Sequence, residues 1–293
     1  MRFIFQLCRV IWHHAVTIFL FTRSDIKTVV IPMSLSALSL VPRAHLSRIP
    51  EGIFWIWVHV LQFDISNQSI GIEEDRVNKA WRPLLAGRVT INSARLCWRL
   101  LVPTCSLNSL HYGFETACAS LVLCIFTVIH NDFKAHRHWL LKNVVSAVGL
   151  AAFETGAAVI IGRGWVQLDR TSLLALCLSI AIHVTTLHAQ DFKDVAGDQR
   201  IGRCTLPIIA PEFSRYTMIC GLTAWSVALG CVWGLRHWLH VLLVILGIFT
   251  GYRFVSMREI GDDQVSYYWY NLWLAIVHLL PSYRRLMCEV YVN

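Results

Sequence analysis

Charged residues are scarce in this sequence. Only 15% of its 293 residues are Asp, Glu, Lys or Arg, whereas 56% are hydrophobic, and the mean hydropathy is +0.53. A water-soluble domain needs a more polar surface than this composition supplies. The composition therefore predicts a membrane protein, in which ~20 consecutive apolar residues make one spanning helix.

Other features are missing as well. The ten cysteines include no Cys-x-x-Cys pair, so a zinc site or a disulfide framework is not expected. The net charge of +8 is spread over short segments between apolar runs, without basic tracts, which excludes a nucleic-acid-binding protein. Because no low-complexity linker divides the chain, residues 1–293 are predicted to form a single transmembrane domain. We infer no obligate protein partner.

Nine apolar segments are long enough to be candidate spans: 27–45, 50–69, 91–109, 114–130, 143–162, 171–190, 214–233, 237–254 and 267–285. The first and third are the weakest, because Pro32, Arg95, Arg99 and Pro103 interrupt them. Backbone polar groups in lipid must be hydrogen-bonded within their own segment, so each span is expected to be helical. The predicted fold class is an all-α integral membrane protein with about nine transmembrane helices.

The first 26 residues are predicted to form an amphipathic helix that lies on the membrane surface. A secretory signal peptide is the alternative. Its apolar region would be interrupted by His13 and His14, and no small-residue cleavage site follows.

The basic residues predict the orientation of the chain. Thirteen of them lie in or beside the connections that follow the even-numbered spans, and five follow the odd-numbered ones. Connections rich in Lys and Arg stay in the cytosol. We therefore expect a multi-pass protein, in the endoplasmic reticulum membrane, whose charged loops and active site face the cytosol.

Two of these cytosolic connections hold acidic groups at helical spacing. The first polar island is residues 64–90, DISNQSIGIEEDRVNKAWRPLLAGRVT, and the second is residues 188–208, HAQDFKDVAGDQRIGRCTLPI. In the second island, Asp191, Asp194 and Asp198 share one helix face. In the first island, Asn67 and Asp75 lie eight residues apart on one face, with Gly71 between them.

Stacked carboxylates repel one another and need a counter-ion. Oxygen ligands favour a hard cation such as Mg²⁺, which completes its shell with water and substrate phosphate. The predicted metal ligands are Asn67, Asp75, Asp191, Asp194 and Asp198. The groups predicted to bind a phosphorylated substrate are Asn67, Lys79, Arg82, Lys142, Lys193 and Arg200. The plainer alternative is a pair of solvated loops.

The two islands resemble the motifs of the UbiA superfamily of intramembrane prenyltransferases. The family's second motif, DxxDxxGDxxxGxxTLP, is matched in full by residues 191–207. Its first motif, NDxxDxxxD followed by NKPxRP, is matched at Asn67, Asp75, Asn78, Lys79, Arg82 and Pro83. Its YxxxK feature keeps Lys142, with His138 at the tyrosine position. The resemblance implies nine helices around a central cavity, Mg²⁺ as cofactor and a prenyl diphosphate as substrate.

The departures from the first motif narrow the resemblance to one group within the superfamily. Gln68 and Gly71 stand where the family has two aspartates, and Glu73 and Glu74 offer partial compensation. The remaining pattern, NxxxGxxxD with a later DxxxD, looks like that of fungal and bacterial UbiA-type terpene cyclases. Those enzymes ionise a linear prenyl diphosphate and close the cation on its own double bonds, without an acceptor.

The sequence therefore predicts a Mg²⁺-dependent terpene cyclase of secondary metabolism that acts on farnesyl or geranylgeranyl diphosphate. Asp75, Asp191, Asp194 and Asp198 are its predicted catalytic residues. The alternative is a UbiA-type prenyltransferase with an aromatic or other acceptor, and a transporter is a third possibility. Aromatic side chains that could stabilise a cation, or simply face lipid, are Trp55, Trp57, Phe63, Phe126, Phe153, Trp269 and Tyr270.

Glu154 and His183 are two ionisable residues deep within predicted spans. Glu154 stands in the middle of span 143–162, where a carboxylate is unfavourable and usually functional. It is expected to line the cavity, to act as a late base that quenches the cation, or to pair with a buried arginine such as Arg95 or Arg99. His183, about two helical turns before Asp191, is interpreted as a hydrogen-bonded core histidine.

Overall fold

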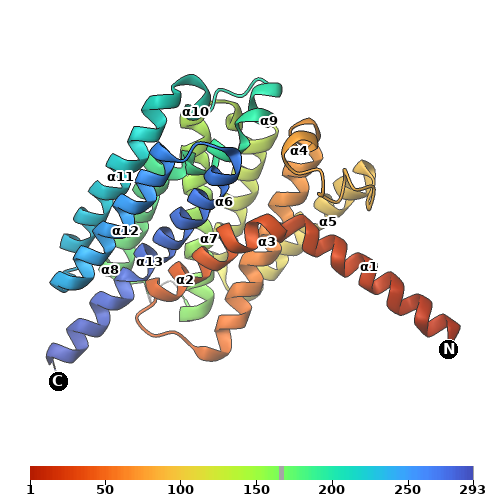
Figure 1. Cartoon of the computed structure of the whole chain (residues 1–293). Coiled ribbons are helices and arrows are strands. Elements are labelled where there is room, and N and C mark those ends of the chain that lie inside the picture. Colours follow the sequence, from red (N-terminus) through yellow and green to blue (C-terminus); the bar gives the residue numbers. More distant parts are fainter. Residues whose placement is uncertain (165–167, 293) are drawn as a thin grey trace.

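The computed structural model describes residues 1–164 and 168–292, and these residues are almost entirely helical. No β-strand occurs within those ranges; one isolated parallel bridge pairs His138 with Cys204. The predicted all-α class is confirmed. Figure 1 shows long helices side by side, with the C-terminus at the end opposite the short helices α4, α9 and α10.

The chain begins with helix α1 (Arg2–Asp25), which leaves the bundle sideways (Figure 1). The predicted N-terminal helix is therefore present, and its place on a membrane surface stays a prediction. The helix does not end near residue 26, however. It continues through a π-helical turn, η1 (Ile26–Val30), into α2 (Ile31–Leu40). Pro32 cannot donate the usual backbone hydrogen bond, and a π turn just before it relieves the misfit.

The other long helices coincide with the predicted apolar segments. They are α3 (Ile49–Ile70), α5 (Ile91–Tyr112), α6 (Phe114–Asn131), α7 (Trp139–Gly162), α8 (Arg170–Thr186), α11 (Pro211–Val232), α12 (His237–Ser256) and α13 (Ile260–Val292). Neighbours in sequence pack together, such as α6 with α7 and α11 with α12. Helix α2 packs against both α7 and α13, so the first and last parts of the chain close the bundle.

Five helical segments within the described ranges are long and apolar enough to cross a membrane: Ile4–Leu40, Phe114–Asn131, Trp139–Gly162, Arg170–Arg200 and His237–Ser256. The number of nine spans therefore stays a prediction. Large apolar side chains also cover outer faces of the bundle; on α12 they include Leu242, Ile245 and Phe249, each at least 40% exposed. Such a surface is suited to lipid rather than to water.

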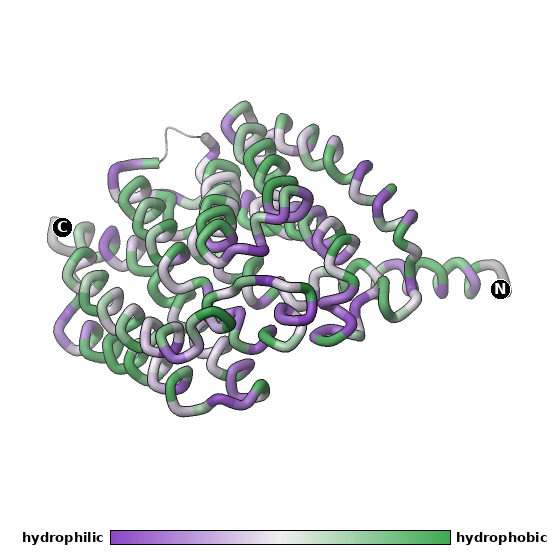
Figure 2. The backbone as a smooth tube through the Cα atoms, turned by 90° about the horizontal axis from the view of Figure 1, so that it is seen from above, coloured by the Kyte–Doolittle hydropathy of each residue, from purple (hydrophilic) through white to green (hydrophobic). Residues whose placement is uncertain are grey.

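The short helices gather at one end of the bundle. They are α4 (Ile72–Asn78), η3 (Ala135–Arg137), η5 (Leu187–Gln190), η6 (Phe192–Asp194), α9 (Val195–Arg200) and α10 (Leu206–Ile209). Figure 2 looks down on this end and shows hydrophilic segments between the largely hydrophobic long helices. A further short helix, η2 (Leu46–Arg48), lies in the connection between α2 and α3. The two polar islands therefore meet at one end, as the sequence predicts.

Close packing below this end depends on small residues. An added Cβ at Gly156 of α7 would lie 2.2 Å from the Trp55 ring of α3, so only glycine fits there. Trp55 is fully buried and donates its Nε1–H to Ser109 Oγ of α5 at 2.8 Å. One tryptophan thus ties three helices together toward the end of the bundle opposite the polar islands.

Candidate active site

The two polar islands are in direct contact. Helix α4 packs against α9, and Asn78 Nδ2 donates a hydrogen bond to the Asp194 carbonyl at 3.2 Å. A Cβ at Gly197 would lie 2.2 Å from Asn78 Nδ2. The glycine of the second motif therefore allows the first island to approach this closely.

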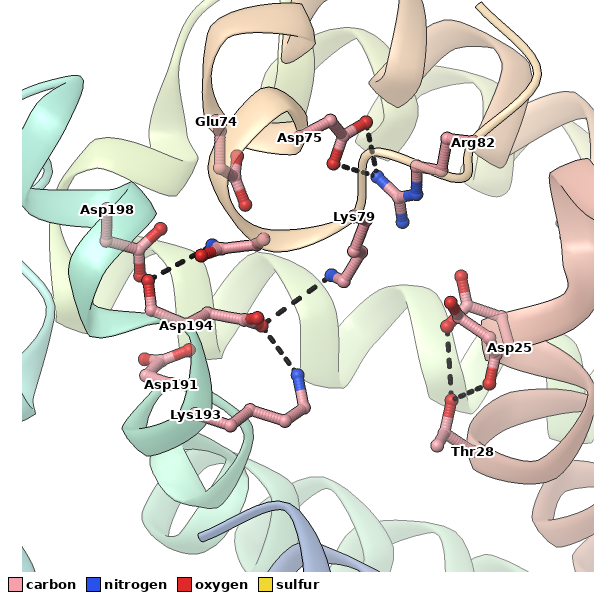
Figure 3. A network of polar contacts seen from close by, with 12 residues as sticks. Asp25, Thr28, Glu74, Asp75, Lys79, Arg82, Asp191, Lys193, Asp194 and Asp198 are labelled. Atoms are coloured by element: carbon pink, nitrogen blue, oxygen red, sulfur yellow. Dashed lines mark hydrogen bonds and ion pairs between the residues drawn. The ribbon is translucent and has the colours of Figure 1, made fainter. Parts of the chain in front are cut away.

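Asp75 and Arg82 form a buried pair within the first island. Arg82 Nη1 donates to Asp75 Oδ1 at 2.6 Å and to Oδ2 at 2.8 Å (Figure 3). Burial raises the pKa of Asp75 above its ordinary value, although the guanidinium opposes that shift. The pair holds the Arg82 side chain at the edge of the site.

Three lysines form ion pairs with two carboxylates of the second island. Lys142 of α7 binds Asp191, and both side chains are buried. Lys193 Nζ lies 2.6 Å from Asp194 Oδ2, and Lys79 Nζ of the first island lies 3.7 Å from the same oxygen (Figure 3). Asp194 is thus shared between the two islands.

Arg203 makes a second link between the islands, and sequence reasoning did not single it out. Its Nη1 lies 2.8 Å from Asp198 Oδ1, and its Nη2 lies 2.7 Å from Glu74 Oε2. Arg200, which the sequence predicts as a substrate contact, has an exposed side chain at the end of α9. The backbone turns back after Arg200 and brings Arg203 to the carboxylates.

A cavity of about 1380 Å³, counting its open mouth, begins beneath these ion pairs. Five of the residues predicted for the site line it: Asn67, Lys79, Arg82, Lys142 and Asp194. Glu74 and Arg203 line it as well. Of the remaining predicted residues, Asp75, Asp191, Asp198 and Lys193 stand one layer behind, in contact with the lining side chains or beside them in sequence.

Aromatic side chains line the rest of this cavity. They are Phe63, Phe126, Phe153, Tyr267 and Tyr270, contributed by α3, α6, α7 and α13. Four of these belong to the aromatic residues noted in the sequence, whereas Trp55, Trp57 and Trp269 are outside the lining. The cavity therefore has a charged mouth and an aromatic, largely apolar wall.

The acidic groups fit a hard divalent cation. Asp191 Oδ2 and Asp198 Oδ2 are buried, and neither has a hydrogen-bond partner among the described residues. Five carboxylates and five cations pair in this layer: Glu74, Asp75, Asp191, Asp194 and Asp198 with Lys79, Arg82, Lys142, Lys193 and Arg203. Because these charges balance, a polyanionic substrate would leave an excess of negative charge unless divalent cations accompany it.

Comparison with known proteins identifies the family. Residues 28–275 match the UbiA prenyltransferase family. This chain belongs to the UbiA family. The match covers the bundle and both islands.

Two relatives are terpene synthases. The chain is 31% identical to the fumagillin beta-trans-bergamotene synthase of Aspergillus fumigatus, over 94% of each chain. It is 28% identical to the somaliensene A/B synthase of Streptomyces somaliensis, over 91% of this chain and 93% of that one. This UbiA protein is therefore an enzyme of the terpene cyclase or prenyltransferase kind.

The fold agrees with a solved member of the family. A UbiA homolog from Archaeoglobus fulgidus, solved with GPP and Mg²⁺, superposes with a TM-score of 0.65 over 89% of this chain and 99% of that one, at 11% identity. The likeness supports the helical UbiA fold and, with the family match, an integral membrane protein.

The residues that depart from the UbiA first motif have other contacts here. Gln68 is buried, and its Nε2 donates to the Phe21 carbonyl of α1 at 2.8 Å. A Cβ at Gly71 would lie 3.3 Å from the Asn67 carbonyl oxygen and 3.5 Å from Glu74 Oε2. The position of one lost aspartate thus anchors the N-terminal helix, and the other leaves room beside Glu74.

The structure also places the YxxxK feature and the carboxylate of Glu154. Lys142 lines the cavity, whereas His138 is exposed and stacks on Trp139. Glu154 is fully buried, and its Oε1 accepts a hydrogen bond from Ser179 Oγ at 2.7 Å. His278 Nε2 lies 3.5 Å from Glu154 Oε1, whereas Arg95 and Arg99 are exposed, so the predicted pairing with Arg95 or Arg99 is wrong.

Proposed function

We propose that this enzyme is a membrane-bound, Mg²⁺-dependent class I terpene cyclase. Its substrate would be a linear prenyl diphosphate, farnesyl or geranylgeranyl diphosphate, and its product a cyclic terpene of secondary metabolism. The observation that carries the proposal is the single cavity that joins a cationic mouth to an aromatic wall. The membrane would be that of the endoplasmic reticulum, with the charged mouth on the cytosolic side.

The diphosphate binds at the mouth in this account. Lys79, Arg82, Lys142 and Arg203 line that region and offer ammonium and guanidinium donors to phosphate oxygens. Each is already paired with a carboxylate, which holds its side chain in place before the substrate arrives. Lys193 and Arg200 would order the loops around it.

In this account, acidic groups of both islands bind the metal ions. Asp191, Asp194 and Asp198 would supply carboxylate ligands from the second island, and Asn67 with Asp75 or Glu74 from the first. Asp191 Oδ2 and Asp198 Oδ2 have no hydrogen-bond partner among the described residues, so these two atoms would be available to bind a cation. Bound Mg²⁺ would neutralise the charge that develops on the departing diphosphate.

The aromatic wall suits the cation that remains. Loss of diphosphate leaves an allylic carbocation, which aromatic faces stabilise through their quadrupole. Phe63, Phe126, Phe153 and Tyr270 present such faces within one cavity. The buried wall keeps water from the cation, so the chain closes on its own double bonds.

The test supplies membranes that contain the enzyme with geranyl, farnesyl or geranylgeranyl diphosphate, in Mg²⁺ and without an acceptor. Hexane extracts are analysed by gas chromatography and mass spectrometry. We expect a cyclic hydrocarbon or alcohol from one chain length, absent from the Asp194→Ala control. Bound but intact diphosphate, released only when an aromatic acceptor is added, would instead favour the prenyltransferase alternative.

A further inference from the structure

A histidine in the cavity wall has one ring nitrogen without a partner. His183 of α8 lines the cavity and is fully buried. Its Nδ1 lies 2.9 Å from the Ser179 carbonyl oxygen, and a carbonyl can only accept a hydrogen bond. Nδ1 therefore carries the hydrogen, and Nε2 carries the lone pair.

The lone pair of His183 is not engaged by a neighbouring group. Among the described residues, Nε2 has no hydrogen-bond partner. A second cavity histidine, His59 of α3, shows the contrast: its Nδ1 bonds to the Trp55 carbonyl at 2.8 Å, and its Nε2 bonds to Ser120 Oγ at 2.9 Å. Both nitrogens of His59 are thus engaged, whereas His183 keeps a vacant basic site.

A polar cluster lies beside Nδ1 of His183. Ser179 Oγ lies 2.7 Å from Glu154 Oε1, 3.2 Å from His278 Nε2 and 3.3 Å from His183 Nδ1. These side chains come from α7, α8 and α13. A buried network of this kind is unfavourable in an apolar bundle unless it has a function.

Resting on the proposed function, we propose that His183 Nε2 is the base that ends the cyclisation. A C–H bond beside the cationic carbon breaks, and its electron pair forms a new C=C bond. The proton moves to the Nε2 lone pair and gives an imidazolium, next to the Ser179–Glu154 cluster. The proton then leaves with the released diphosphate, so the product is a hydrocarbon rather than an alcohol.

The same side chains could in principle hold a metal ion, since donor atoms of Glu154, His183 and His278 lie within 4.8 Å of one another. The Ser179 hydroxyl, however, already bonds to all three, and His183 Nδ1 donates to a carbonyl. The geometry therefore favours a proton acceptor over a metal centre.

The experiment compares three full-length proteins in membranes: wild type, His183→Gln and His240→Gln. His240 is the matched control, because its Nε2 is also buried without a partner among the described residues but lies outside the cavity lining. Each receives farnesyl or geranylgeranyl diphosphate with Mg²⁺ and no acceptor. The inorganic diphosphate released and the hydrocarbon formed are both measured, and metal content is determined by mass spectrometry.

We expect His183→Gln to release diphosphate while hydrocarbon per diphosphate falls at least about 100-fold, with alcohols in its place. His240→Gln should match wild type. If His183→Gln fails to fold, Ser179→Ala removes the hydroxyl that bonds to Glu154, His278 and His183 Nδ1, and it should shift the ratio in the same direction.

An unchanged ratio of hydrocarbon to diphosphate in the folded His183→Gln variant would overturn the inference and leave the proposed function standing. Where Ser179→Ala replaces that variant, an unchanged ratio in Ser179→Ala would have the same meaning. A wild-type product that is only an alcohol, or a stoichiometric transition metal that the variant loses, would do the same. Absence of acceptor-free diphosphate release in wild type would overturn both.

Discussion

Asp194 is the residue on which most of the site converges. Lys193 and Lys79 approach one of its carboxylate oxygens, and Asn78 donates to its backbone carbonyl. It also lines the cavity, so its charge faces both the other island and the cavity.

Asp194→Ala should therefore abolish turnover, by at least about 100-fold, while the protein still accumulates in membranes. Asp198→Ala should behave alike. A matched control is Asp169→Ala, which removes a carboxylate that pairs with Arg285 outside the site. Retained activity in the Asp194 and Asp198 variants would contradict their assignment as metal ligands.

Arg82 should matter for substrate binding, and Arg236 should not. Arg236 is an exposed arginine in the connection between α11 and α12, whereas Arg82 lines the cavity. Arg82→Ala should raise KM for the prenyl diphosphate about tenfold, because a charge-assisted hydrogen bond is lost. Initial rates across substrate concentration measure this effect.

The Arg82 change leaves the buried Asp75 carboxylate unpaired and so destabilises the fold. Arg82→Lys keeps a positive charge beside Asp75 and removes only the guanidinium fork, so it separates the two effects. Equal KM values for Arg82→Ala and Arg236→Ala would refute the placement of the diphosphate.

At the scale of residues, the sequence predicted which kinds of side chain form the site better than which positions supply them. The sequence predicted that Lys142, Lys79 and Arg82 lie near the aspartates, because these residues belong to connections on the same predicted side of the membrane and match the motifs of the family. It predicted Arg200 instead of Arg203, because the turn after α9 depends on contacts with α4 that no local pattern encodes. The contact of Gln68 with Phe21 likewise joins residues 47 positions apart.

At the scale of elements, the site depends on how closely α4 approaches α9. Gly197 makes this possible, since a side chain there would collide with Asn78. The apolar runs predicted the long helices well because length and hydropathy decide them. They predicted two separate helices that meet near residue 26 and missed their continuity through the π turn Ile26–Val30, because Pro32 just after it resembles a helix start in sequence.

Gly197→Ala should lower turnover by about tenfold or more, since Asn78 must move and its bond to the Asp194 carbonyl is lost. Gly261→Ala is the control, because a Cβ there meets open space. In a double-mutant cycle, Asn78→Ala should remove most of the additional loss that Gly197→Ala causes. Simple additivity of the two changes would mean that the glycine acts elsewhere.

At the scale of the whole molecule, the paired charges of the site balance before substrate arrives. Five paired carboxylates and five paired cations form the mouth of a cavity whose wall is aromatic. Prenyl diphosphate and divalent cations are therefore expected to bind together, and neither alone should bind tightly.

Chelation tests that expectation. EDTA should reduce product formation to background, and added Mg²⁺ should restore it, because the diphosphate would otherwise meet unscreened carboxylates. Diphosphate binding, followed with labelled substrate, should fall in parallel. Full turnover in excess EDTA would exclude a metal-dependent mechanism.

The most direct test of the central claim is stoichiometry in the purified enzyme without any acceptor. Inorganic diphosphate and cyclic terpene are measured together over time from farnesyl or geranylgeranyl diphosphate with Mg²⁺. The account predicts one cyclic product for each diphosphate released, with both lost in Asp194→Ala. Diphosphate release that requires an added acceptor, or that yields no cyclic product, would contradict it.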